Sequence, residues 1–339
     1  MRAMTLVEPG RFEPTAVDDP PPGAGEARVR VHRVGVCGTD LHAFAGRQPF
    51  FEFPRILGHE LGVEVVEVGE GVENVAVGDR CAVEPYLECG RCIACRAGRP
   101  NCCDALRVLG VHIDGGMRPV FNLPARKLHR SDKLSFDQLA LVETLAIGTH
   151  AVARADPKPD ERALVVGAGP IGLAAMQGLI GLGIKPIVGD VNPQRLAFCR
   201  EAIGIEHTVD MTAADAIDQL RDERGELPTL LVDATGHPAS MSASVDRVAP
   251  GGRVVFVGLF VGELTVHDPT FHRKEITLLA SRNALASDFD RLIRLIEDDR
   301  IDTLPWINRR LDLWSLPDAF AELAGQPDLV KAMIEVDPQ

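Results

Sequence analysis

The sequence predicts an α/β protein with two domains, a β-rich domain followed by a doubly wound parallel sheet with helices on both faces. The chain has 339 residues, which is too long for one ordinary hydrophobic core. Residues 62–83 form short β-rich runs separated by glycines, the pattern of a small barrel-like domain. Residues 163–166 form an apolar strand that runs into a glycine-rich turn, and strand-like and helix-like runs alternate after it.

Composition and charge exclude several classes of function. The formal net charge is −13, and phosphate binding needs a basic surface, so we expect no nucleic-acid partner. The apolar run 163–183 has the length of a membrane span, but Pro170, Gln177 and several glycines divide it into strand, turn and helix. No signal peptide is visible at the N-terminus, so we expect a cytoplasmic protein whose eight cysteines are thiols or metal ligands.

The β-rich domain should begin with a strand over residues 26–37. Polar residues alternate with apolar ones there, and His32 falls on the face that we interpret as solvated. Cys81 lies inside a later apolar strand, where we expect a buried thiol.

Four cysteines at short intervals predict a structural zinc site. Cys89, Cys92, Cys95 and Cys103 have the spacing C-x2-C-x2-C-x7-C, which can close on one tetrahedral ion and hold a loop without regular structure. Disulfides explain the pattern less well in a reducing compartment, and an iron–sulfur cluster explains it less well because no proline follows the last cysteine. Cys102 is the alternative fourth ligand, although Cys103 is preferred.

Three further side chains are candidates for a second metal site. Cys37, His59 and Glu143 provide a thiolate, an imidazole and a carboxylate, a donor set that leaves one position open on a tetrahedral zinc ion. Taken one at a time, Cys37 suits a buried thiol, His59 a loop residue and Glu143 a solvated residue of a helix over 135–153. A metal partner removes the cost of burying the carboxylate in that apolar helix.

The glycine-rich turn carries a dinucleotide-binding fingerprint. Gly167, Gly169 and Gly172, with Pro170 and Ile171 between them, follow a strand and open a helix. Glycines at these positions allow a tight turn, and a pyrophosphate can then lie against the helix N-terminus.

Asp190 should determine the choice of cofactor. It ends the second strand, 18 residues after Gly172, where a carboxylate accepts hydrogen bonds from ribose hydroxyls and repels a 2′-phosphate. NAD is therefore favoured over NADP, although Arg195 is near enough in sequence to accommodate that phosphate. The alternative role of Asp190 is to cap a helix that begins near Pro193.

The remaining elements complete the predicted sheet. We expect strands over 230–234, 254–258 and 276–280, with helical stretches near 194–203, 213–224, 239–248, 288–297 and 315–324. The apolar last strand would lie at the edge of the sheet, where pairing with a second subunit would cover it.

Together these motifs resemble the zinc-dependent medium-chain dehydrogenases. The resemblance rests on Cys37-Gly38-Thr39-Asp40, Gly58-His59-Glu60, the four-cysteine lobe and the strand-linked fingerprint, although Gly62 falls one place short of the last glycine of the family pattern. It implies a GroES-like catalytic domain over 1–145 and 287–339, with a structural-zinc lobe at about 86–104. A Rossmann NAD-binding domain would occupy 146–286.

The resemblance also implies roles for single residues. Cys37, His59 and Glu143 would bind the catalytic zinc, and Asp40 would orient His59. Glu60 would adjoin the metal and sometimes replace Glu143, which leaves open which carboxylate is bound at rest. Thr39 and His42 would relay the alcohol proton. Arg282 would face the substrate.

The expected function is reversible, NAD-dependent oxidation of a secondary alcohol to a ketone, with two zinc ions per chain. A glutamate as third ligand is typical of sorbitol and threonine dehydrogenases, although Thr144 stands where those relatives have proline. Phe53-Pro54-Arg55, Gly110-Val111-His112 and Ser281-Arg282-Asn283 resemble L-galactonate or L-gulonate dehydrogenases. Other alcohols such as threonine or butanediol, a zinc-independent reductase and a non-enzymatic zinc-stapled binding protein are the alternatives. We expect a homodimer or homotetramer.

Overall fold

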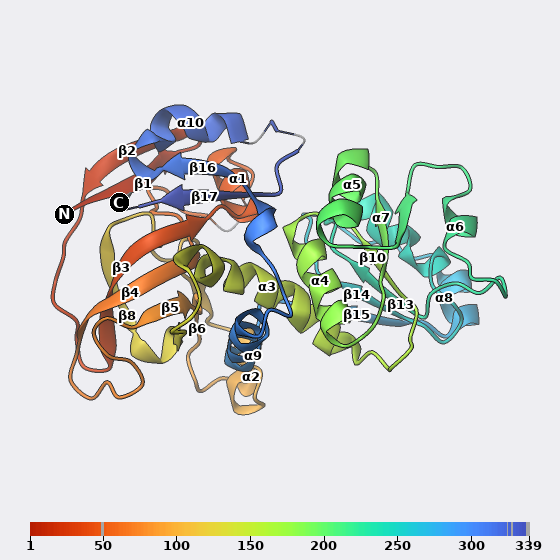
Figure 1. Cartoon of the computed structure of the whole chain (residues 1–339), viewed down its shortest axis with the longest axis horizontal. Coiled ribbons are helices and arrows are strands. Elements are labelled where there is room, and N and C mark those ends of the chain that lie inside the picture. The colour runs from red at the N-terminus through yellow and green to blue at the C-terminus, as the bar shows by residue number, and fades with distance from the viewer. Residues whose placement is uncertain (49–50, 324, 327, 337–339) are drawn as a thin grey trace. The chain divides into compact units, whose positions relative to one another are not determined.

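The computed structural model describes residues 1–48, 51–323, 325–326 and 328–336. The chain divides into two compact units (Figure 1). The first unit comprises Met1–Glu143 and Leu285–Gln339, and the second comprises Thr144–Ala284. The boundary therefore falls inside α3 (Phe136–Ala155), whose first turns belong to the first unit and whose later turns belong to the second.

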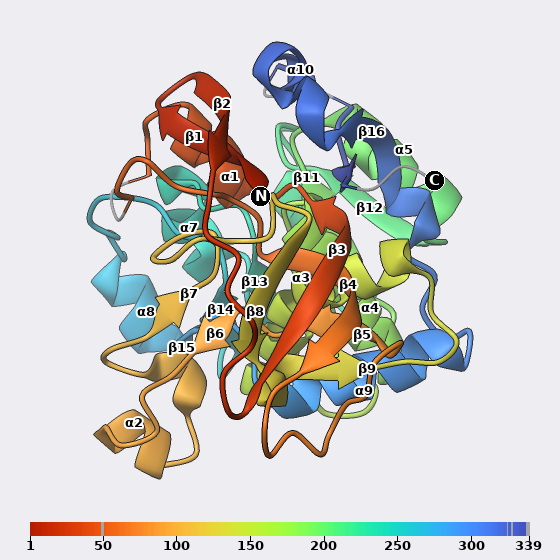
Figure 2. The same cartoon turned by 90° about the vertical axis from the view of Figure 1, so that its left-hand side faces the viewer.

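The first unit is built around a seven-stranded sheet in which β3 and β4 lie side by side (Figure 2). The order is β16-β17-β3-β4-β5-β9, with β8 also paired to β3. Its strands are β3 (Glu26–Gly35), β4 (Glu60–Val68), β5 (Arg80–Val83), β8 (Val120–Pro124), β9 (Leu128–Arg130), β16 (Ile307–Asp312) and β17 (Lys331–Glu335). Two-stranded sheets join β1 (Arg2–Glu8) to β2 (Arg11–Ala16), and β6 (Tyr86–Leu87) to β7 (Arg107–Val108). The C-terminal segment thus completes the sheet that the N-terminal segment begins.

Besides the first turns of α3, four shorter helices are described in this unit. They are α1 (Gly38–Phe44), α2 (Ile93–Arg96), α9 (Ala286–Glu297) and α10 (Leu316–Leu323). The 3-10 turns are Pro100–Cys102, Ala125–Lys127, Leu304–Trp306 and Leu313–Ser315. Gly62 lets β4 approach the start of α3, because a Cβ at this position would lie 2.2 Å from the carbonyl oxygen of Phe136. The glycine is therefore a packing requirement between strand and helix.

The expectation for His32 was wrong. Its side chain is buried, stacks on the ring of Phe136 at 3.9 Å and places Nε2 3.2 Å from a carboxylate oxygen of Glu64. The register of β3 against β4 shifts between Val31 and Arg33, so two consecutive residues, Val31 and His32, are both buried. Such a bulge interrupts the alternation from which the sequence prediction was made.

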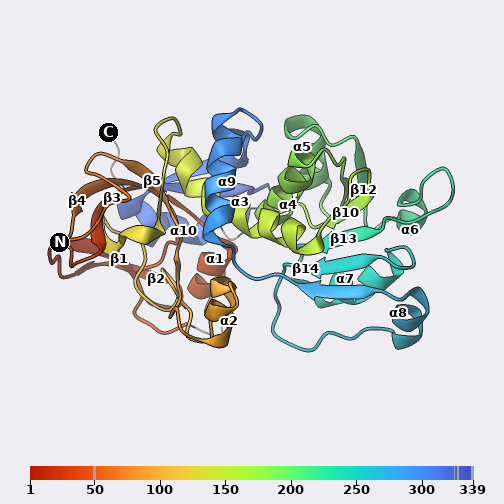
Figure 3. The same cartoon turned by 90° about the horizontal axis from the view of Figure 1, so that it is seen from below.

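The second unit contains a parallel six-stranded sheet with the order β12-β11-β10-β13-β14-β15. Figure 3 shows α4 and α5 on one face of it and α7 and α8 on the other. The strands are β10 (Ala163–Val166), β11 (Ile187–Asp190), β12 (His207–Asp210), β13 (Leu230–Asp233), β14 (Arg253–Phe256) and β15 (Thr277–Ala280). The helices are α4 (Pro170–Gly181), α5 (Pro193–Ala202), α6 (Ala216–Gln219), α7 (Pro238–Ala243) with a 3-10 turn Ser244–Asp246, and α8 (Asp268–Lys274). The doubly wound prediction is confirmed.

One predicted helix of this unit is much shorter than expected. The sequence predicted a helix over 213–224, but α6 ends at Gln219. The Asp222 side chain accepts hydrogen bonds from the backbone N–H groups of Arg224 and Glu226, which stabilises a turn where the helix would continue. Across the described ranges, no helix is both long enough and apolar enough to span a membrane.

Candidate metal centre and cofactor site

The first predicted ligand, Cys37, caps helix α1 directly after β3. The backbone N–H of Cys37 donates to Oδ2 of Asp40 at 2.9 Å, so the first turn of the helix fixes the buried Asp40 carboxylate beside the thiol. The other carboxylate oxygen, Oδ1, lies 3.9 Å from Nδ1 of His59. Asp40 is therefore placed between Cys37 and His59, as an orienting residue would be.

His59 and Glu60 follow a tight turn at Gly58, whose φ is +94° and whose Cβ would clash with Val34. Both side chains are buried. Ligand atoms of Cys37, His59 and Glu60 all lie within 4.8 Å of one another, close enough to share one metal ion. In the described chain Glu143 is not part of this mutually close set.

Glu143 is nevertheless buried near these residues, on α3. Its Oε1 accepts a hydrogen bond from the hydroxyl of Tyr86, 57 residues earlier in the chain. Burial and the charge of Glu60 raise the pKa of Glu143, against the opposing influence of His59 and Tyr86. Burial together with the Glu143 charge also raises the pKa of Tyr86 well above its usual range, so Tyr86 remains a neutral donor.

Glu60 has a cationic partner of its own. The Nζ of Lys331 lies 2.7 Å from both carboxylate oxygens and 3.2 Å from the carbonyl oxygen of Val36. Both side chains are 1% exposed. Gly35 makes room for the carboxylate, because a Cβ there would lie 2.1 Å from Oε2 of Glu60. The carboxylate is therefore confined between a glycine and a buried ammonium group.

These residues fit a divalent metal ion. Burial lowers the pKa of His59, but the Cys37, Asp40 and Glu143 charges outweigh it and raise this pKa well above its usual range. The site therefore favours a positive charge at the position of the imidazole. Nδ1 of His59 and Oδ1 of Asp40 are buried without hydrogen-bond partners. A sulfur, a nitrogen and a carboxylate oxygen are also the donors that zinc selects.

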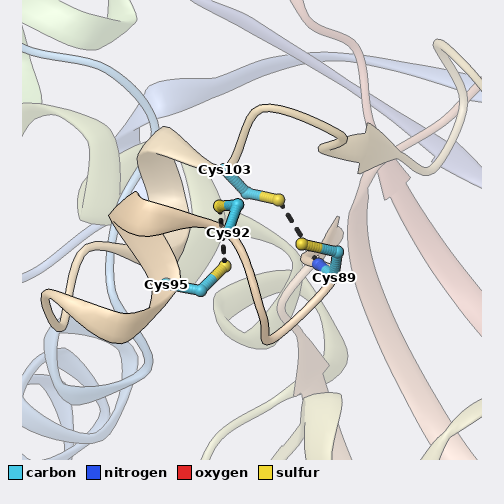
Figure 4. Close-up of side chains that lie close together, drawn as sticks. All are labelled: Cys89, Cys92, Cys95 and Cys103. Carbon is cyan, nitrogen blue, oxygen red and sulfur yellow. Dashed lines mark hydrogen bonds between the residues drawn. The ribbon is translucent and has the colours of Figure 1, made fainter.

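The four-cysteine lobe forms a second cluster (Figure 4). The sulfurs of Cys89, Cys92, Cys95 and Cys103 all lie within 4.8 Å of one another. Cys103 is buried, whereas the neighbouring Cys102 is exposed and outside the cluster. Backbone N–H groups of Cys95 and Asp104 lower the pKa of Cys92 to about 6, which favours the thiolate that a metal requires. The lobe thus fits one tetrahedral zinc ion.

In the second unit, the glycine-rich turn joins β10 to α4. Gly167 has a φ of +95°, and a Cβ on Gly172 would lie 1.7 Å from the carbonyl oxygen of Gly167, so no larger residue fits. Pro170 and Ile171 are the first residues of α4. Backbone N–H groups at the helix N-terminus are then available to a pyrophosphate.

Asp190 ends β11 next to this turn. Its Oδ2 accepts from the backbone N–H of Ala168 at 2.6 Å, and its Oδ1 accepts from Asn192 at 2.8 Å. Asn192, and not Asp190, caps α5, because its side chain accepts from the N–H groups of Gln194 and Arg195. The alternative role of Asp190 as a helix cap was therefore wrong. A Cβ on Gly169 would lie 3.9 Å from Nη1 of Arg195, so this guanidinium also borders the turn.

The remaining predicted residues lie in two places. Thr39 and His42 are three residues apart in α1, the spacing of neighbours on one helix face, and His42 is exposed. Arg282 is exposed in the second unit, directly after β15.

Sequence reasoning missed two residues that contact the predicted carboxylate ligands, Tyr86 and Lys331. Each carried a signal. Tyr86 is the only tyrosine of the chain and lies three residues before the first cysteine of the lobe, and Lys331 is a charged residue that directly precedes three apolar residues of its strand. Neither feature indicates which carboxylate the side chain contacts, because Glu143 lies 57 residues from Tyr86 and Glu60 lies 271 residues from Lys331.

Comparison with known proteins identifies the family of the chain. The family model described as the alcohol dehydrogenase GroES-like domain matches residues 23–133, and the one described as zinc-binding dehydrogenase matches residues 170–298. L-galactonate-5-dehydrogenase of Escherichia coli (strain K12) is 39% identical over 317 residues, 93% of either chain.

The chain belongs to the zinc-type alcohol dehydrogenase family.

Solved structures of this family share the whole fold. An alcohol dehydrogenase from Escherichia coli CFT073, in complex with NADH, has a TM-score of 0.92 at 30% identity and covers 99% of both chains. A zinc-binding dehydrogenase from Sinorhizobium meliloti 1021, bound to NADP, has a TM-score of 0.90 at 28% identity and covers 99% of both chains. Membership in this family confirms the oxidoreductase class and the prediction of a GroES-like domain with a Rossmann domain.

Proposed function

We propose that this enzyme oxidises a secondary alcohol of a sugar acid or polyol reversibly to a ketone, with NAD as hydride acceptor and zinc as Lewis acid. The observation that carries the proposal is the approach of Cys37 to His59, whose ligand atoms lie within 4.8 Å of one another and of a Glu60 carboxylate oxygen, with Glu143 as a second buried carboxylate on α3. The likeness to L-galactonate-5-dehydrogenase supports a sugar acid of the L-galactonate type as substrate.

Two separate groups of residues would bind the two zinc ions. Cys37, His59 and Glu143 would bind the catalytic zinc, which supplies Lewis acidity that lowers the pKa of an alcohol. Asp40 would hold His59 in the orientation that ligation needs. Lys331 pairs with Glu60 and thereby reduces the negative charge beside the ligand set.

The four cysteines Cys89, Cys92, Cys95 and Cys103 would bind the structural zinc.

Proton transfer would use α1. Thr39 would accept the alcohol proton and pass it toward His42, which is three residues further along the helix and exposed to solvent. Replacement of His42 by Gln should lower kcat most at low pH, where a proton acceptor outside the site matters most for alcohol oxidation. An unchanged pH profile would remove His42 from the relay.

NAD would bind the second unit. Gly167, Gly169 and Gly172 let the pyrophosphate approach the N-terminus of α4, where Pro170 and Ile171 begin the helix. Asp190 would accept hydrogen bonds from the ribose hydroxyls, and Arg195 would lie close to the phosphates. Arg282 would contribute to substrate recognition.

Metal analysis and a substrate panel test the proposal. The native protein should hold two zinc ions per chain, whereas Cys37→Ser or His59→Ala should hold one, lose turnover and retain NADH binding. Equal loss of turnover and NADH binding would assign the first site a structural role. NADH formation should be fastest with sugar acids such as L-galactonate, compared directly with sorbitol, threonine and butanediol.

We further propose a cytoplasmic homodimer that pairs through β15. None of the eight cysteines, all of which the structure describes, forms a disulfide, as expected of thiols and zinc ligands in a reducing compartment. β15 is an edge strand, and Leu259 and Val261, in the segment after β14, are 80% and 79% exposed. A second copy would cover this edge. Light scattering should give twice the chain mass, and the Leu259→Asp/Val261→Asp double variant should shift it toward the monomer.

A further inference from the structure

Tyr86 is a buried residue to which the proposed mechanism assigns no role. It is the only tyrosine of the chain and is 3% exposed. Its hydroxyl donates to Oε1 of Glu143, and this contact joins the segment before the four-cysteine lobe to helix α3. The phenol therefore bonds directly to a carboxylate that is proposed to bind the catalytic zinc.

The backbone around Tyr86 is held on both sides. Glu84 and Glu88, two residues before and two residues after it, both form ion pairs with the buried Nζ of Lys127, at 2.5 and 2.6 Å. Glu84 and Glu88 lie on either side of the short strand β6 (Tyr86–Leu87), so one ammonium group fixes the chain both before and after Tyr86. Lys127 thus clamps the segment that presents the phenol.

The ring of Tyr86 is also fixed by packing. It forms a T-shaped contact with the ring of Phe289 of α9, with centroids 6.4 Å apart and planes inclined by 74°. Phe289 stacks in turn on His129 at 4.9 Å. Buried rings in such contacts have few alternative rotamers. The hydroxyl therefore occupies one position relative to Glu143.

The two carboxylates near the metal centre differ in their partners. Both oxygens of Glu60 bond to the ammonium group of Lys331, which neutralises this carboxylate. Glu143 instead accepts a hydrogen bond at Oε1 from a neutral phenol. A neutral donor restricts the orientation of a carboxylate but leaves its negative charge for a metal ion.

We propose that Tyr86 is the positioning residue for the catalytic zinc, and that its hydroxyl orients Glu143 so that the other carboxylate oxygen is presented to the metal. The inference rests on the proposed function, because it takes Glu143 as the third ligand. In this role Tyr86 would act through Glu143, without being a ligand of the metal itself. Loss of the hydroxyl should weaken the catalytic zinc and leave the zinc of the cysteine lobe unchanged.

Zinc affinity of Tyr86→Phe tests the proposal. Competition with a chromogenic chelator should show the catalytic zinc bound about 10-fold more weakly than in the native protein, the lower end for loss of a residue that orients a ligand. The zinc of the cysteine lobe should be unaffected. Tyr86→Phe should have no further effect in the Glu143→Gln background, where its target is already altered. Equal zinc affinity in Tyr86→Phe and native protein would overturn the proposal.

The single tyrosine offers a second measurement. Biosynthetic incorporation of 3-fluorotyrosine gives one ¹⁹F resonance, which reports on residue 86 alone. A chelator that removes the catalytic zinc should shift this resonance in the native protein. The same treatment should leave the resonance unchanged in Cys37→Ser, which lacks that zinc. A resonance that does not respond to zinc in the native protein would contradict the assignment.

Different results would overturn the proposed function and the role of Tyr86. A native protein that holds only the lobe zinc would overturn both the proposed function and the role of Tyr86. A protein that loses one zinc in Cys37→Ser, but binds it with native affinity in Tyr86→Phe, would keep the proposed function and overturn the role of Tyr86 alone.

Discussion

Lys331 and Glu60 form a bidentate ion pair, with both carboxylate oxygens 2.7 Å from Nζ, although 271 residues separate them in the chain. The pair joins β17, from the C-terminal segment, to the start of β4. Burial lowers the pKa of Lys331, but the Glu60 and Cys37 charges outweigh burial and raise it. The lysine is therefore charged in the folded protein, and the C-terminal strand contributes directly to the charge balance of the metal centre.

Replacement of Lys331 by Met should destabilise the protein strongly. The substitution leaves the Glu60 carboxylate buried without its cation, which costs about 3–5 kcal/mol in comparable sites. Urea unfolding measures the change. Lys185→Met is the matched control, because Lys185 pairs with Glu206 on the surface, where both side chains are more than 70% exposed, and its loss should be barely measurable. The Lys331→Met/Glu60→Gln double variant should recover part of the loss; a strictly additive result would show that the pair is not coupled.

The cysteine lobe allows a test with two adjacent thiols. Cys103→Ser should lose the structural zinc and lower the thermal midpoint, because a buried ligand of the cluster is removed. Cys102→Ser should retain both zinc ions and the native midpoint, since that thiol is exposed. Metal analysis and thermal unfolding of the two variants distinguish them. The reverse pattern would assign the fourth ligand to Cys102.

Two substitutions of Asp190 separate its proposed recognition of the ribose from its hydrogen bond to the glycine-rich turn. Asp190→Asn removes the charge but keeps an acceptor for the Ala168 N–H, so it should shift the NADP-to-NAD ratio of kcat/KM toward NADP by about 10-fold. Asp190→Ala should also weaken both cofactors, because the Ala168 N–H loses its acceptor and the turn loosens. Steady-state kinetics with each cofactor measures this. An unchanged ratio in both variants would exclude Asp190 from ribose recognition.

Asp137 should make stability depend on pH. Burial opposes its ionisation, but hydrogen bonds and charges from Arg310 and Arg33 outweigh burial and lower its pKa below the ordinary value of 3.8. The carboxylate therefore stabilises the fold above that value, and this contribution disappears as pH falls through the lowered pKa.

Asp137→Asn should accordingly reduce the free energy of unfolding by about 1–2 kcal/mol at pH 7, with the difference from native protein narrowing below about pH 4. Urea titrations at pH 7, 5 and 3.5 measure it. Asp132→Asn is the control, since this carboxylate is 74% exposed and should show little change. A difference that stays constant down to pH 3.5 would contradict the role of the Arg33 and Arg310 pairs.

The elements with strong local patterns were predictable from sequence, and those shaped by register were not. The glycine-rich turn after β10 and the buried strands β10, β13 and β14 follow from local sequence, because each is defined by residues within a few positions. His32 was misplaced because a bulge between paired strands changed which face it occupies. α6 was overextended because Asp222 stabilises a turn instead of a further helical turn.

The sequence by itself determined the fold class, the family and the types of donor available for metals, because these depend on short motifs and their order. The tertiary structure decided which side chains meet. It grouped Glu60 with Cys37 and His59, gave Glu60 a lysine from the far end of the chain, and gave Glu143 a neutral phenol. Such pairings arise only when distant strands and helices are packed together, so no local pattern specifies them.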